Sequence, residues 1–194
     1  MDSSLLYFYS TIPQIVAAII AFIFVFVIFK LQDYDKYKQV QCSNFLEEIT
    51  QYIRYNKSLS FDFSKKNELQ TKYQIGYLKD VTGLMTDLCD DIRNINEDFP
   101  NKLSIQKLET ITSSTRKIEE MKKSLISWSI WICAYGFFVI TCSIVVLYFV
   151  KLICLHNHLS MSLFICFIIL TSIFLALVLR LLIVSLRNKE KLGK

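Results

Sequence analysis

Three long blocks without a charged residue dominate this sequence. Residues 12–29, 125–150 and 159–179 contain no Asp, Glu, Lys or Arg over 18, 26 and 21 positions. About 20 apolar residues in helical conformation are enough to cross the hydrocarbon core of a bilayer. The helices of a soluble bundle would carry charges on their solvent-facing side, which these blocks lack. The sequence therefore predicts three transmembrane helices.

Composition indicates that the whole chain is helical. Its 194 residues include only four Gly and two Pro, too few turn formers for a many-stranded sandwich or barrel. The first block is expected to be a retained span and not a cleaved signal, because only Asp2 is charged before Lys30 and no positive n-region precedes it. We expect an all-α integral membrane protein with a helical cytoplasmic insert between the first and second spans.

The distribution of basic residues predicts the orientation of the spans. Cytoplasmic segments that flank spans carry an excess of Lys and Arg. No basic residue precedes the first span, and only Lys151 lies between the second and third. By contrast, basic residues follow the first span, precede the second and follow the third. The N-terminus is therefore expected outside the cell, and residues 30–124 and the C-terminus in the cytoplasm.

Four segments follow from this orientation: a first span over 1–30, a cytoplasmic helical bundle over 31–124, two spans over 125–186 and a basic tail over 187–194. No Pro or Gly lies between Pro13 and Asn56, so the first span is expected to continue into the cytoplasm as one helix. A second long helix is expected to lead into the second span. Apolar stripes predict one shorter helix between them, from about Ser64 to Ile95, and hence a three-helix bundle.

Self-association is expected because three helices of this size enclose little apolar volume. Near-heptad apolar rows on the two long helices suit coiled-coil packing between subunits, although packing within one subunit explains them equally well. We expect a homo-oligomer in the lipid bilayer, with a tetramer as one arrangement.

The residue types used in catalysis or metal binding do not form recognisable sets. The six cysteines include no C-x-x-C pair, and His156 and His158 have no further ligands nearby. The acidic residues between Asp87 and Asp98 lack the alternation and central Gly of a calcium loop. No acidic pair or histidine cluster lies within the spans. We expect no metal, no cofactor and no enzymatic activity.

Cations and aromatic rings alternate at the tip of the insert. Residues 54–79 contain six basic and two acidic side chains, a net charge of +4, interleaved with Tyr and Phe. Such a surface suits a nucleotide or a single-stranded oligonucleotide, because cations contact phosphates and rings stack on bases. Lysines on a solvated tip and aromatics in a small core explain the pattern equally simply. The candidate ligand-binding residues are Arg54, Lys57, Lys65, Lys66, Lys72, Tyr73 and Lys79.

Two polar residues within the spans are candidates for pore lining or gating. Arg180 would be costly inside the membrane and could line a pore, or extend to the cytoplasmic headgroups. Gln14 follows Pro13 near the outer end of the first span and precedes small residues at 17, 18 and 21. This stretch could line a pore or pack against another helix.

The layout resembles that of small membrane effectors in bacterial anti-phage abortive-infection systems, the Hailong-type effectors in particular. The resemblance lies in the three spans, the basic tip at 54–79 and the opening phrase Ser-Thr-Ile-Pro-Gln at 10–14. It implies an oligomeric pore in the bacterial inner membrane, held inactive by a single-stranded DNA oligomer that a partner nucleotidyltransferase makes. Between Lys30 and Ser124 the chain has 16 basic and 15 acidic residues, whereas those effectors carry an electropositive cytoplasmic region.

The leading functional hypothesis is a homo-oligomeric membrane pore that is gated through its cytoplasmic domain and acts in anti-phage defence. The alternative is a non-conducting, membrane-anchored adaptor whose insert docks a cytoplasmic partner protein. A phage holin is a third candidate, but it would not need a 95-residue insert.

Overall fold

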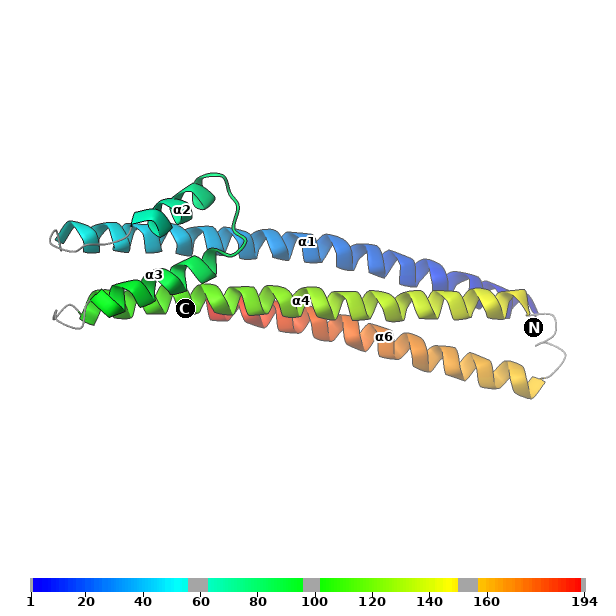
Figure 1. The fold of residues 1–194 in the computed structure, drawn as a ribbon. Helices are drawn as coiled ribbons and strands as arrows, with labels where there is room; N and C mark the ends of the chain where they lie inside the picture. Colours follow the sequence, from blue (N-terminus) through cyan, green and yellow to red (C-terminus); the bar gives the residue numbers. More distant parts are fainter. Residues whose placement is uncertain (1, 56–62, 96–101, 150–156, 193–194) are drawn as a thin grey trace. The chain divides into compact units, whose positions relative to one another are not determined.

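The computed structural model describes residues 2–55, 63–95, 102–149 and 157–192, and in these ranges the chain is helical without strands. Its helices are α1 (Asp2–Tyr55), α2 (Phe63–Gln74), α3 (Val81–Ile95), α4 (Lys102–Tyr148) and α6 (Asn157–Leu192) (Figure 1). Three of them, α1, α4 and α6, are long and apolar enough to cross a membrane. The all-helical class and the three apolar helices predicted from the sequence are therefore present.

The chain divides into two compact units. The first, here called the span unit, comprises Met1–Phe29 and Lys123–Lys194. The second, Lys30–Lys122, is here called the four-helix unit because α2 and α3 pack in it with the second half of α1 and the first half of α4. Helices α1 and α4 each pass from one unit to the other without a break in helical conformation.

Apolar side chains at helical spacing build the core of the four-helix unit. On α1 they recur three or four residues apart, which places them on one face of the helix. Helix α3 repeats the pattern, while α2 and α4 each contribute one fully buried leucine. The buried side chains are Cys42, Phe45, Ile49, Tyr52, Leu69, Val81, Met85, Leu88, Cys89, Ile92 and Leu108.

The single short helix predicted between Ser64 and Ile95 is two helices in the structure. Helix α2 ends in a Schellman motif, in which the amide of Gly76 donates to Tyr73 O (3.1 Å) and that of Tyr77 to Lys72 O (2.9 Å). Gly76 has a φ of +70°, a conformation that glycine adopts without steric cost. The chain then turns, and α3 begins after Asp80.

Three contacts position the helices of the span unit. A Cβ atom at Gly136 would come within 2.8 Å of Ile20 Cδ1 and 2.9 Å of Phe174 Cε2, so α1 and α6 both approach α4 closely at this glycine. The Tyr135 hydroxyl donates to Leu170 O across 3.2 Å, joining α4 to α6.

The third contact explains how α1 accommodates a proline within a span. Pro13 has no N–H, so the carbonyl of Tyr9, four residues earlier, loses its usual helical donor. The buried Ser143 hydroxyl on α4 donates to this carbonyl at 2.8 Å. A neighbouring helix thus supplies a donor to the carbonyl that faces the proline, as would be needed if this helix crosses a bilayer.

Candidate functional site

A groove of about 430 Å³ lies between α1 and α2 on the four-helix unit. Its α1 wall consists of positions three or four residues apart, which share one face of the helix. Its α2 wall comes from the last two turns of that helix. The lining residues are Ser43, Leu46, Glu47, Thr50, Gln51, Arg54, Gln70, Tyr73 and Gln74.

The groove is polar and carries one charge of each sign. Glu47 and Arg54 are exposed, and neither forms an ion pair within the described part of the chain. Three glutamine amides and three hydroxyl groups supply the remaining polar atoms. Tyr73 is half-buried and packs against the core, so its ring is held in place from behind.

The structure brings together only some of the ligand-binding residues predicted from the sequence. Arg54 and Tyr73 both line the groove. Lys65 instead pairs with Asp91 on α3 at 2.6 Å. These positions are thus divided between the groove and other faces of the unit.

The remaining predicted positions lie elsewhere. Lys72 pairs with Glu68 one turn earlier on α2 at 2.8 Å, and this hydrogen bond raises the pKa of the Lys72 ammonium. Lys66 is half-buried on α2, and Lys79 is exposed in the turn before α3. Lys57 lies outside the described residues.

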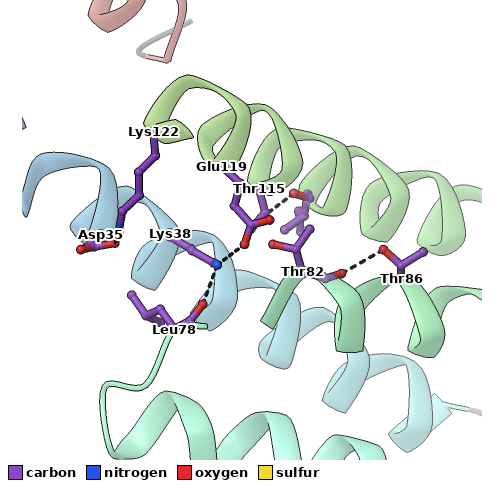
Figure 2. A network of polar contacts seen from close by, with 9 residues as sticks. Asp35, Lys38, Leu78, Thr82, Thr86, Thr115, Glu119 and Lys122 are labelled. Carbon is purple, nitrogen blue, oxygen red and sulfur yellow. Dashed lines mark hydrogen bonds and ion pairs between the residues drawn. The ribbon is translucent and has the colours of Figure 1, made fainter. Parts of the chain in front are cut away.

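A buried lysine lies at the centre of a second polar site. In the sequence it was only one of the basic residues after the first span that predict the orientation of the spans. Lys38 is 6% exposed, and its ammonium donates to the Glu119 carboxylate on α4 and to Leu78 O at 2.5 Å (Figure 2). Leu78 belongs to the α2–α3 turn. One cation therefore connects α1, α4 and the turn, an arrangement here called the Lys38 clasp.

The position of Lys38 follows from the spacing of its own helix. It lies four residues after Tyr34 and four before Cys42, two buried residues, so it falls on the core-facing row of α1. The sequence contained a signal for this site, because a lysine at a core-facing position of an apolar row needs a partner for its buried charge. Burial raises the pKa of the Cys42 thiol to about 11, although the neighbouring Lys38 charge acts in the opposite direction.

Further polar groups surround the clasp. Lys122 pairs with Asp35 at 2.7 Å, a second ion pair between α4 and α1 (Figure 2). The Thr115 hydroxyl is fully buried and donates to the carbonyl of Ile111 on its own helix. The Thr82 hydroxyl, at the start of α3, is buried without a hydrogen-bond partner in the described structure. The ion pairs Lys38–Glu119 and Lys122–Asp35 thus connect α1 and α4 close to Lys30 and Lys122, the two ends of the four-helix unit along the chain.

In the span unit, Arg180 stacks on a tryptophan. Its guanidinium carbon lies 5.1 Å from the centroid of the Trp128 ring, a cation–π contact between α6 and α4. Trp128 is only five residues from Lys123, a rise of about 7.5 Å along α4. Arg180 therefore lies near the charged end of the candidate span. In a membrane, arginine at such a position extends to headgroups and tryptophan prefers the interface.

Gln14 lies on α1 at a different level. The contacts Tyr9–Ser143 and Ile20–Gly136 place residue 14 opposite the middle of 136–143, roughly 17 Å along α4 from the cation–π pair. Its side chain is exposed in the single chain. The two predicted pore residues thus do not form one constriction.

Metal-ligating residues do not cluster in the described ranges: no group of three His, Cys, Asp or Glu there could hold a metal ion. No family model, curated protein or solved structure matched the chain in comparisons with each. The polar groove, the Lys38 clasp and the span unit are therefore the basis for a functional proposal.

Proposed function

We propose that this chain is an integral membrane protein that assembles into a homo-oligomeric pore and is gated through its four-helix unit. The exposed amide of Gln14 is the observation that carries the proposal. A glutamine amide that faces hydrocarbon has no hydrogen-bond partner and is costly there. Contact with another copy or with a water-filled lumen removes this cost.

The surroundings of Gln14 support the same interpretation. Ala17, Ala18 and Ala21 follow it three, four and seven residues later, and all three are exposed. Small residues allow close packing of membrane helices. In each of the three apolar helices, less than a third of the most apolar 18-residue window is buried within one chain, so much span surface remains for lipid or further copies.

Gating through the four-helix unit is supported by the Lys38 clasp. The clasp joins α1 and α4, and each of these helices contains a candidate span. Its second contact, between the Lys38 ammonium and Leu78 O, makes the geometry of the ion pair depend on the α2–α3 turn. A ligand that changes this turn would alter the pairing of the two helices, provided that it binds the open and closed states with different affinity.

Arg180 belongs to the cytoplasmic end of this proposed pore. Its place beside Trp128 suits a role at the headgroup level and not in the centre of the membrane. In the proposed orientation, residues 30–124 and the C-terminus lie in the cytoplasm of a bacterial cell. Depolarisation of the inner membrane is how an abortive-infection effector of the kind that this layout resembles would act.

Expression in bacteria with a membrane-potential dye tests the proposal. We expect the wild-type chain to depolarise cells, and Gln14→Leu to reduce the depolarisation at least fivefold, because the polar face of α1 is lost. Ser172→Leu is the matched control, since it replaces an exposed polar residue on α6. An intact membrane potential with the wild-type chain folded in the membrane would instead indicate the non-conducting adaptor.

A further inference from the structure

The groove between α1 and α2 contains two unlike charges, and both are available to a ligand. Glu47 and Arg54 have no ion-pair partner in the described part of the chain, whereas the adjacent Glu48 pairs with Lys107 at 3.4 Å. Lys65, on the same unit, is also paired. The two groove charges thus differ from Glu48 and Lys65, each of which has an oppositely charged partner.

The two charges have a defined spacing. Glu47 and Arg54 are seven residues apart on α1, nearly two full turns, so they share one face of the helix. The helical rise separates their Cα atoms by about 10 Å along the axis. A ligand that satisfies both needs a cationic group and an anionic group about that far apart.

Three amides complete the recognition surface between the charges. Gln51 lies between Glu47 and Arg54 on α1, and Gln70 and Gln74 are one turn apart on the facing α2. A glutamine amide both donates and accepts hydrogen bonds, as a peptide group does. Phosphates, by contrast, only accept hydrogen bonds and would be repelled by Glu47.

We propose that the groove binds a short free peptide of about three residues in extended conformation. Its α-ammonium lies at Glu47, its terminal carboxylate at Arg54, and its peptide groups contact the glutamine amides. Three extended residues span about 10 Å, which matches the separation of the two charges. A volume of about 430 Å³ is within the range of pockets for small ligands.

Such a ligand would reach the clasp through a short segment. Gln74 is the last residue of α2, and the Gly76 turn separates it from Leu78. The Leu78 carbonyl accepts a hydrogen bond from the Lys38 ammonium. A peptide that holds Gln74 thus restrains the turn on which the clasp depends. The effect of the peptide on gating rests on the proposed function, whereas peptide binding to the groove does not depend on it.

Calorimetry on the full chain in nanodiscs, with trialanine as the probe, tests the proposal. We expect binding that weakens at least tenfold when the peptide is N-acetylated and C-amidated, and likewise with Glu47→Gln or Arg54→Gln. Glu48→Gln is the matched control and should leave the affinity unchanged. Circular dichroism verifies that each variant retains its helix content.

Three results would overturn the proposal: no binding at millimolar trialanine, equal binding of the blocked peptide, or an affinity unaffected by both groove variants. Displacement of trialanine by a short oligothymidylate that binds more tightly would also overturn it, in favour of a nucleic-acid ligand. Binding of trialanine without depolarisation of cells would contradict the pore and support the peptide site. Depolarisation without binding would support the pore and contradict the peptide site.

Discussion

The hydrogen bond from Ser143 to Tyr9 O should matter because of Pro13, and this dependence can be measured. In the wild-type chain Pro13 provides no donor to the Tyr9 carbonyl, and the Ser143 hydroxyl donates to it. Ser143→Ala removes the hydroxyl that donates to this buried carbonyl. In a Pro13→Ala background the amide of residue 13 supplies the helical donor, and the same substitution should cost less.

The magnitude follows from hydrogen bonds between membrane helices. Such bonds contribute about 0.6 kcal/mol on average and up to about 1.7 kcal/mol. We therefore expect Ser143→Ala to lower the free energy of unfolding by about 1.5 kcal/mol in the wild-type chain. In the Pro13→Ala background we expect about 0.5 kcal/mol, a coupling of about 1 kcal/mol.

A double-mutant cycle on reversible unfolding in detergent measures this coupling. Ser129→Ala is the matched control, because Ser129 is also buried on α4 and donates to a carbonyl at 2.7 Å. That acceptor is Leu125 O on the same helix, and it does not depend on Pro13. Additive effects of Ser143→Ala and Pro13→Ala, or equal coupling for Ser129→Ala, would refute the explanation.

Three further predictions concern packing, buried charge and pH. Gly136→Ala should destabilise the span unit by about 1–3 kcal/mol, since its Cβ would meet Ile20 Cδ1 at 2.8 Å; thermal unfolding measures the loss, and Ile20→Val should restore part of it. Lys38→Met should cost about 2–3 kcal/mol because it removes the buried ammonium that contacts Glu119 and Leu78 O. Adding Glu119→Leu should recover most of this loss in denaturant unfolding, and a double variant as unstable as Lys38→Met would contradict the clasp. Because burial raises the Cys42 pKa from 9.0 to about 11, the folded protein keeps a thiol proton that the unfolded chain loses above pH 9. The thiol should therefore leave the free energy of unfolding unchanged below pH 9 and lower it between pH 9 and 11, and this decrease should be smaller in Cys42→Ala. An equal decrease in Cys42→Ala would exclude the thiol as its source.

Uninterrupted patterns made the long helices predictable. Charge-free blocks of sufficient length identify α1, α4 and α6 as candidate spans, and the absence of a helix-breaking residue between Pro13 and Asn56 predicts the continuity of α1. These properties depend on neighbours in sequence. The α2–α3 break depends instead on Gly76 in a left-handed conformation, a single residue that a count of four glycines does not reveal.

The sites were only partly predictable because they depend on how helices dock. Arg54 and Tyr73 were chosen for their charge and ring, and both line the groove. Glu47 was not predicted as a ligand-binding residue, because it becomes part of the groove only when α2 packs alongside α1. Lys38 lies on an apolar row that could be seen in the sequence, but its partner is 81 residues away and cannot be assigned from spacing.

The distance in sequence between Lys38 and Glu119 has a consequence for biogenesis. Chains grow at about 5–20 residues per second, so Lys38 emerges roughly 4–16 s before its partner carboxylate is made. During that interval it is a solvated cation nine residues beyond Phe29, and in the proposed orientation it would add to the positive charge that favours the cytoplasmic side for this flank. Synthesis of Glu119 then supplies its partner, so a cation that is solvated in the nascent chain later becomes part of the mature interior.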